Sequence, residues 1–204
     1  MTKFKIRSLK GTATMIDRRQ NIIEAASKSF TLFGYKATTM EQVAKIANVG
    51  KGTIYTFFET KEELFKEIVK DLIKQIREVA VAAIHEDRPF HENLHSALYG
   101  ILDFRKNHQL AIKITQEVKE MNTPAVREAS QMLESAVLKF VKKELEKAIE
   151  KGEIKPCNTE ITAFLMIRMY VSLVFDWERE HQPLSKEEIA HVLENVLING
   201  LRNH

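Results

Sequence analysis

The chain has 204 residues, of which 44% are hydrophobic, so it is long enough for one or two domains with a buried core. Its single cysteine, Cys157, excludes an internal disulfide framework, and no Cys-x-x-Cys or Cys/His cluster suggests a structural zinc site. The net charge of +3 is uneven: residues 1–58 carry ten Lys or Arg against three Asp or Glu, and residues 59–204 carry 21 against 25, which is typical of a nucleic-acid-binding module joined to another domain.

Residues 1–15 are basic but have no continuous apolar segment, so they do not read as a secretory signal. We expect a flexible N-terminal arm that either enters a minor groove of DNA or is a disordered tail with weak attraction to DNA. The cysteine usage favours a reducing compartment, and we expect the cytoplasm.

Residues 16–59 predict three helices, over 16–33, 39–47 and 51–57. Thr38 and Thr39 are each followed three positions later by an acidic or amide residue, as in a capping box that opens the second helix. Asn48 and Gly50, which tolerate a tight turn, separate the second helix from the third. The third helix carries small polar residues that a core does not need and that suit the close approach of a helix to a major groove. These residues are Lys51, Gly52, Thr53, Tyr55 and Thr56.

Over residues 16–65 the chain resembles the TetR family of transcriptional regulators. The matching residues are Ala25, Ala26, Phe30, Gly34, Tyr35, Thr38, Thr39, Ala44, Ala47, Val49, Gly52, Thr53, Ile54, Tyr55, Phe58, Lys61, Glu62 and Leu64. The resemblance implies an all-α DNA-binding repressor, not an enzyme, that reads a palindromic operator as a homodimer with its two reading helices roughly 34 Å apart. Asn48, Gly50 and Phe57 depart from the family pattern, so the operator sequence does not follow from it.

The DNA-binding residues that we expect on this basis are Thr38, Thr39, Lys51, Gly52, Thr53, Tyr55, Thr56, Phe57 and Lys61. Lys51 and Thr53 are the candidates for contacts to base edges. Thr39, Tyr55 and Lys61 would contact phosphates and set the position of the protein on the duplex.

Residues 60–204 predict a larger helical domain, with helices over 60–86, 91–106, 108–120, 124–151, 158–181 and 186–202 and no strand pattern. Residues 163–175 are apolar nearly all round, which a helix needs when more than one side is covered. A span of this length with Arg168 inside it is shorter than the roughly 20 apolar residues that cross a bilayer. The resemblance implies a ligand-binding and dimerisation domain whose helices at 158–181 and 186–202 form the dimer.

Apolar and aromatic residues of this larger domain are candidates for the wall of an effector pocket, and equally for ordinary core. They are Phe104, Met121, Met132, Met166, Met169, Tyr170, Phe175 and Trp177, together with Arg168. A guanidinium among apolar neighbours needs a partner, and we expect Glu117 or Asp176 ahead of an anionic ligand. Residues 104–121 and 185–204 loosely resemble regulators that respond to fatty acyl-CoA, which favours an apolar or amphipathic effector. A regulator without a small-molecule inducer, acting as an activator or controlled by a protein, is the alternative.

His91, Glu92 and His95 form a literal His-Glu-x-x-His, the pattern in which two imidazoles bind zinc and the carboxylate acts as a base. A zinc-dependent hydrolase is therefore the enzyme alternative. The longer form of this motif would need Gly at position 98 and His at position 101, where Leu98 and Ile101 stand. We therefore expect no catalytic or metal site and no cofactor.

Overall fold

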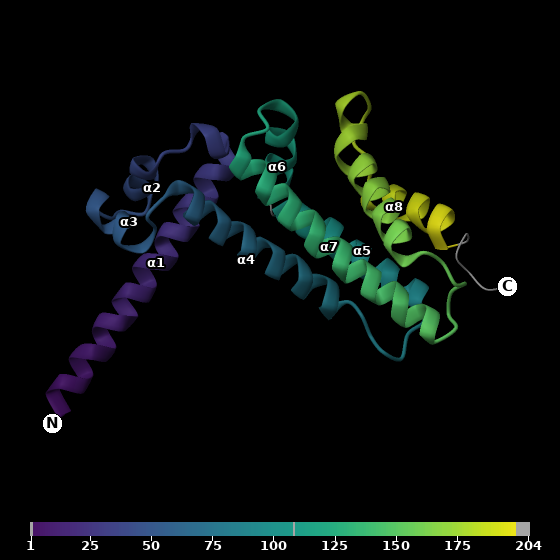
Figure 1. Ribbon diagram of the computed structural model, residues 1–204, viewed down its shortest axis with the longest axis horizontal. Helices are drawn as coiled ribbons and strands as arrows, with labels where there is room; N and C mark the ends of the chain where they lie inside the picture. The colour runs from purple at the N-terminus through teal and green to yellow at the C-terminus, as the bar shows by residue number, and fades with distance from the viewer. Residues whose placement is uncertain (1, 108, 199–204) are drawn as a thin grey trace. The chain divides into compact units, whose positions relative to one another are not determined.

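The computed structural model describes residues 2–107 and 109–198, and within them the chain is helical with no strand, which confirms the predicted all-α fold (Figure 1). The helices are α1 (Thr2–Ala37), α2 (Met40–Ile46), α3 (Lys51–Phe57), α4 (Lys61–Ala82), α5 (Phe90–Asn107), α6 (Gln109–Glu120), α7 (Pro124–Glu150), α8 (Thr159–Val171) and α9 (Lys186–Leu193). A π-helical segment, Ser172–Asp176, and a 3-10 turn, Trp177–Arg179, follow α8. A second π-helical segment, Glu194–Ile198, follows α9.

Local capping chemistry places most helix ends where the sequence predicts them. Thr39 with Gln42 and Ser185 with Glu188 both form reciprocal capping boxes, at the starts of α2 and α9. Asn48 takes the left-handed conformation, with φ of 53°, in the turn between α2 and α3. These helix ends depend on residues that are close together in the sequence, so the sequence pattern predicts them.

The helix bounds at the two ends of the chain differ from the prediction. Helix α1 begins at Thr2, so the described part of residues 1–15 is helical, and the flexible arm over these residues stays a prediction. That segment contains no proline, so nothing in it removes a main-chain donor from the helix. The predicted helix over 158–181 changes to π geometry at Ser172. Residues 199–202, the end of the last predicted helix, lie outside the described residues.

The chain divides into two compact units. The first unit contains the chain up to Asp71 together with Leu110–Ser130, and the second contains Leu72–Gln109 and the chain from Gln131 onward. The chain therefore leaves the first unit within α4, returns to it with α6, and leaves it again within α7. This division differs from the predicted domain boundaries at 15/16 and 59/60, which stay predictions.

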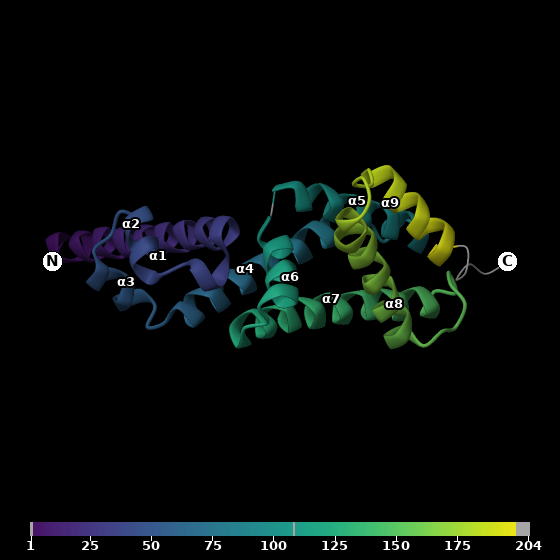
Figure 2. The same cartoon turned by 90° about the horizontal axis from the view of Figure 1, so that it is seen from above.

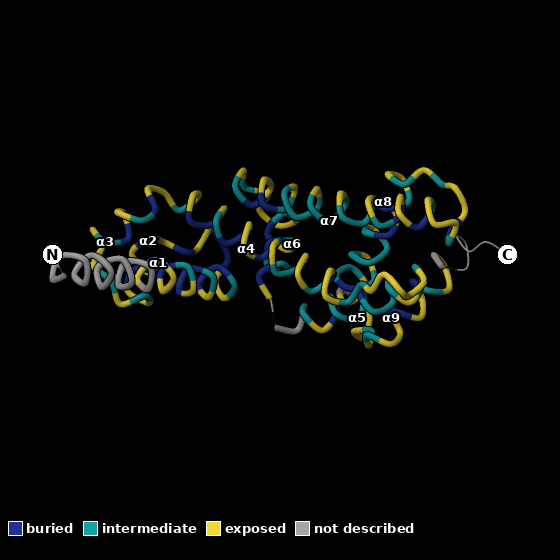
Figure 3. Tube along the Cα trace, turned by 90° about the horizontal axis from the view of Figure 1, so that it is seen from below, coloured by how far each residue is buried: buried dark blue, intermediate teal, exposed yellow. Residues whose placement is uncertain are grey.

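Aromatic packing organises the core of the first unit. The rings of Phe30 and Phe65 meet edge to face with centroids 5.0 Å apart, and the Tyr35 ring lies 4.7 Å from Phe65 and 5.8 Å from Phe30. Helices α2 and α3 bury Val43, Ile54 and Phe58 fully or nearly so. Their exposed positions alternate with buried ones along the trace in Figure 3. The burial of one face of each short helix leaves its other face to solvent.

Among the described residues of the second unit, two apolar clusters stand out. One is built on Leu145, Ala148, Ile154, Ala163 and Met166, and the other on Leu102, Val174, Ile189 and Leu193. Helix α9 lies beside α5 (Figure 2), and the second cluster joins these two helices to the segment after α8. Across the described residues, no helix combines the length and the apolar character that crossing a bilayer requires.

The hydroxyl of Tyr35 donates a 2.6 Å hydrogen bond to the carboxylate of Glu62. Burial, reinforced by Glu62, raises the pKa of Tyr35, and the hydrogen bond from Tyr35 lowers the pKa of Glu62. A carboxyl group with a lowered folded-state pKa contributes stability above its unfolded-state pKa and loses that contribution as the pH falls through the folded-state value.

We therefore predict that Tyr35→Phe lowers the free energy of unfolding by about 1 kcal/mol at pH 7, a modest amount because Glu62 is exposed. The difference from wild type should shrink as the pH falls below about 4, where an ordinary Glu protonates. Urea unfolding at a series of pH values measures this, with Tyr55→Phe as a control on an exposed tyrosine. A difference independent of pH would contradict the role of the Tyr35–Glu62 hydrogen bond.

Candidate nucleic-acid interface

Helix α3 carries the predicted reading residues on its exposed face. Gly50 precedes the helix in an extended conformation and makes no side-chain cap. Lys51 and Gly52 are exposed at its first turn, while Ile54 is buried. A Cβ atom added at Gly52 would meet nothing within 4 Å, so this end of α3 is open surface. A duplex can therefore approach the main chain of the first turn closely.

The rest of the exposed face of α3 is small and polar apart from one aromatic ring. Thr56 is exposed and its hydroxyl donates to the Thr53 carbonyl oxygen at 2.7 Å. Tyr55 is exposed, while Thr53 and Phe57 are half-buried. All of the predicted α3 residues except Phe57 and Thr53 are thus largely exposed to solvent.

Lys51, the predicted base-reading cation, already has an acidic partner in the free protein. Its ammonium group bonds the carboxylate of Glu41 on α2, and both side chains are 65% exposed. The hydrogen bond lowers the pKa of Glu41 and raises the pKa of Lys51. Exposed ion pairs contribute little to stability, so DNA can displace Glu41 from Lys51 at small cost. Sequence reasoning missed Glu41, because its partner is ten residues away on another helix.

The two neighbouring threonines before α2 have different roles. Thr38 is fully buried, and its hydroxyl donates to the Gly34 carbonyl oxygen at 2.8 Å and lies 3.1 Å from the Ser29 hydroxyl. The Thr38 side chain therefore faces the core and is not available for DNA, so a contact of Thr38 with DNA stays a prediction for its main chain alone. Thr39 is exposed and accepts a hydrogen bond from the Gln42 amide as the cap of α2.

The Lys61 side chain bonds main-chain carbonyl oxygens where α1 ends and α2 begins. Its ammonium nitrogen donates to the carbonyl oxygens of Tyr35 at 2.9 Å and Thr38 at 3.0 Å, and it lies 4.3 Å from the centroid of the Tyr35 ring. An ammonium group has three N–H donors, so one remains for a phosphate. The first role of Lys61 is to hold the turn from which α2 starts.

Known proteins are similar to this chain in the region that carries these residues and beyond it. Residues 22–68 match the model of bacterial regulatory proteins of the TetR family, and residues 87–201 match the tetracyclin repressor-like C-terminal domain. The chain is 56% identical over 186 residues to the HTH-type transcriptional regulator YhgD of Bacillus subtilis, covering 91% of this chain and 97% of that protein. The chain belongs to the TetR family. It is a DNA-binding transcriptional regulator with an N-terminal helix-turn-helix.

Solved structures of the TetR fold agree with this assignment. The fatty acid degradation regulator FadR of Bacillus halodurans has a TM-score of 0.74 at 20% identity, covering 92% of this chain and 97% of that one. SmeT in its complex with triclosan has a TM-score of 0.75 at 15% identity, covering 91% of this chain and 92% of that one. At these identities the likeness establishes the fold.

The predicted effector residues of this TetR regulator belong to more than one group of packed side chains. Met166 belongs to the cluster around Leu145, whereas Met169, Tyr170 and Phe175 pack against the other cluster of the second unit. Trp177 is exposed, stacks on His181 and donates its Nε1–H to the Gln182 carbonyl oxygen. Met121 is exposed and lies in the first unit, and Phe104 and Met132 are half-buried.

Arg168 has a different partner from those predicted. It bonds the carboxylate of Glu134 on α7, and its guanidinium lies 5.0 Å from the centroid of the Phe164 ring. Its side chain is 49% exposed, so the apolar residues next to it in the sequence do not bury it. The expectation of an ion pair with Glu117 or Asp176 is replaced by a surface pair with Glu134.

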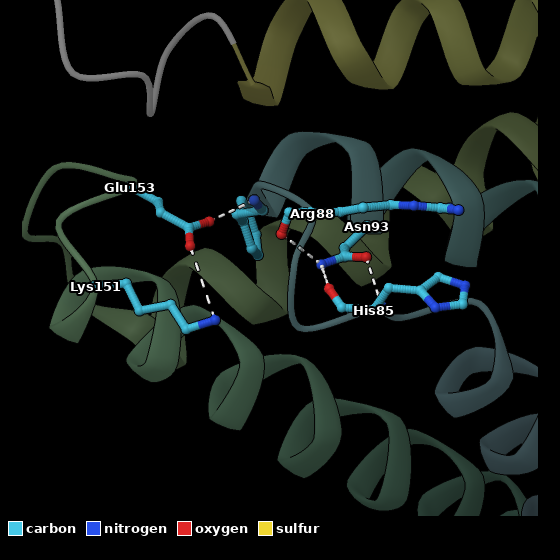
Figure 4. Close-up of polar contacts among 6 residues, drawn as sticks. His85, Arg88, Asn93, Lys151 and Glu153 are labelled. Carbon is cyan, nitrogen blue, oxygen red and sulfur yellow. Dashed lines mark hydrogen bonds and ion pairs between the residues drawn. The ribbon is translucent and has the colours of Figure 1, made fainter.

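The His-Glu-x-x-His segment lies in the first turns of α5, and Asn93, at one of its two variable positions, bonds the loop before the helix (Figure 4). Asn93 accepts a hydrogen bond from the His85 amide at 2.9 Å and donates to the carbonyl oxygens of His85 and Arg88. The first amide of α5, at Phe90, donates to the carboxylate of Glu153, which lies 4.0 Å from the Lys151 ammonium. These contacts join the loop before α5 to the turn after α7.

The histidines of this segment lack the surroundings of a zinc site. Nδ1 of His95 pairs with Glu194, and its ring stacks on Tyr99 with centroids 4.4 Å apart. In the part of the chain that the structure describes, no three His, Cys, Asp or Glu side chains come together to hold a metal ion. The zinc-hydrolase alternative therefore has no support.

We predict that Glu41→Gln strengthens DNA binding about two- to fivefold, because it frees Lys51 and removes a negative charge from the DNA-facing side. Fluorescence anisotropy with a labelled duplex measures the effect. Glu120→Gln, an exposed change of the same charge on α6, is the control for net charge alone. Equal affinities for Glu41→Gln and wild type would contradict the competition between Glu41 and DNA for Lys51.

Proposed function

We propose that this TetR-family regulator is a ligand-responsive repressor that binds a palindromic operator as a homodimer. The observation that carries the proposal is the exposed face of α3, which combines an open first turn with a displaceable lysine. Lys51 and Thr53 would contact base edges, and Thr39, Tyr55 and Thr56 would contact phosphates. Lys61 would add a phosphate contact through its remaining N–H while holding the turn. A regulator must reach the DNA that it binds, so we propose that this one acts in the cytoplasm.

Apolar side chains on α8 and at the end of the chain support dimerisation. Ile161, Phe164 and Leu165 are exposed at the i, i+3 and i+4 spacing of a single helix face. Val192 and Val196, four residues apart, are exposed on the segment of α9 and its π-helical continuation. Helix α8 contacts α9 within the second unit. We propose that these residues meet their symmetry mates in the dimer, as the predicted ranges 158–181 and 186–202 imply.

The effector that we propose is apolar or amphipathic. A structural neighbour named a fatty acid degradation regulator, and another solved with triclosan, support this class. A fatty acyl-CoA is the specific candidate, as the loose resemblance of residues 104–121 and 185–204 implies. The effector would act only through unequal affinity for the DNA-bound and free arrangements of the dimer.

One observation favours the alternative of a regulator without a small-molecule inducer. The predicted lining residues Met166, Met169 and Phe175 pack in or against core clusters. A thermal-shift screen of anionic lipids and hydrophobic drugs discriminates between the two. A compound that raises the melting temperature and releases DNA supports an inducer, and a screen without such a compound supports the alternative.

Selection from a random duplex pool at physiological salt tests the proposed operator. We expect the retained sequences to share a palindrome whose half-sites recur at a fixed spacing near one helical turn, because a twofold dimer presents two equivalent reading helices. Sequencing before and after selection measures the enrichment. Retained sequences with a single half-site and no symmetry would contradict the dimeric reader.

We predict that Phe164→Glu converts the dimer to a monomer, since it places a charge in the apolar surface that we assign to the interface. Sedimentation velocity measures the mass, and the same variant should lose palindrome binding by at least about tenfold. Val81→Glu is the matched control, because Val81 is exposed to a similar extent, 51% against 44%, on α4. A dimeric Phe164→Glu variant would contradict the assignment of α8 to the interface.

A further inference from the structure

Glu117 on α6 is a buried carboxylate whose partners are main-chain amides of the DNA-binding region. Its residue is 5% exposed, and among the side chains that the structure describes it is the one buried acid or base. The amide of Tyr35 donates to one carboxylate oxygen at 2.7 Å, and the amide of Lys36 donates to the other at 3.2 Å. A buried carboxylate is tolerated only with such hydrogen bonds, so this contact is specific to the geometry of the turn from Gly34 to Thr39, which includes the kinked C-terminal end of α1.

Gly34 makes this approach possible. It interrupts the helical geometry of α1 with φ of 82° and ψ of 167°. A Cβ atom at this position would lie 2.7 Å from Oε1 of Glu117 and 2.9 Å from its Cδ. Both the positive φ and the lack of a side chain are therefore needed where the carboxylate meets the main chain.

The turn that Glu117 holds is the one from which the reading helices start. Thr38 closes it onto the Gly34 carbonyl oxygen, and Thr39 caps α2. Helix α2 in turn contacts α3. A change in the direction of the turn would therefore change the orientation of α2 and α3 relative to α1.

Glu117 reaches this turn from a segment that is tied to the second unit at both ends. Leu110–Ser130, which holds nearly all of α6 and the start of α7, belongs to the first unit, while the segments directly before and after it, Leu72–Gln109 and the chain from Gln131, belong to the second. The donor amides and the acceptor carboxylate are 82 and 81 residues apart in sequence. The contact therefore makes the turn depend on the position of α6.

We propose that Glu117 is a positioning residue for DNA reading: through the amides of Tyr35 and Lys36 it fixes the orientation of α2 and α3, and so it sets the preference for the operator over other DNA. The lysines and the helix dipole that attract any duplex do not depend on this contact. A loss of Glu117 should therefore weaken operator binding much more than binding to random duplex.

Glu117→Gln tests the proposal with little change in shape, because the amide keeps one oxygen but turns an NH₂ group toward a main-chain N–H. We expect the ratio of operator affinity to random-duplex affinity to fall about tenfold, or about 1.4 kcal/mol. Hydrogen exchange should accelerate at the amides of Tyr35 and Lys36 and stay unchanged at Ile54 in α3. Glu120→Gln, an exposed substitution on the same helix, should change neither quantity.

A purely stabilising role would give a different result. The folded fraction would then fall, and both affinities would fall together with their ratio unchanged. An unchanged ratio, with or without faster exchange at Tyr35 and Lys36, would overturn the proposal.

Gly34→Ala disrupts the same contact through a change at the main chain and not at Glu117. It keeps the proposal testable if Glu117→Gln folds poorly. The added Cβ would displace the carboxylate, so the affinity ratio should fall in the same direction. In the double variant the two losses should be less than additive, because both remove one contact. Fully additive losses would show that Glu117 and Gly34 act separately, which contradicts the proposal.

Discussion

The turn from Gly34 to Thr39 constrains the whole DNA-binding region, because it connects α1 to α2 and so determines where α2 and α3 lie. Side chains from two other helices hold its main chain. Lys61 at the start of α4 donates to carbonyl oxygens, and Glu117 of α6 accepts from amides. Hydrogen bonds to charged groups contribute about 1.5 to 3 kcal/mol each, which is a large share of the stability of a small unit. The buried Thr38 hydroxyl completes this network from inside.

The reading face combines this rigid support with an adaptable surface. The buried side of α3, at Ile54 and its C-terminal neighbour Phe58, fixes the helix against the core. On the exposed side, the ion pair of Lys51 with Glu41 lies in solvent, so breaking it costs little free energy. In the proposed complex, the basic N-terminal third would attract phosphates, and the choice of DNA sequence would depend on how accurately α3 is oriented.

Local features were predictable from the sequence, and long-range contacts were not. The bounds of α3, the capping boxes at Thr39 and Ser185, and the left-handed Asn48 follow from residues within a few positions of each other. Thr38 and Thr39 carry the same signature in the sequence, yet Thr38 is buried against Gly34 and Ser29 while Thr39 is exposed as the cap of α2. The partners of Lys61, Glu117 and Arg168 lie 23 to 82 residues away, so no periodicity reveals them.

In the proposed dimer, two copies of α3, each oriented by its supporting turn, read adjacent major grooves. Methylation protection at guanine N7 on the selected operator tests it most directly, because N7 faces the major groove. The account predicts two protected patches on the same side of the duplex, related by twofold symmetry and separated by about one helical turn, roughly 34 Å. Protection confined to one patch, or contacts made only in the minor groove, would contradict it.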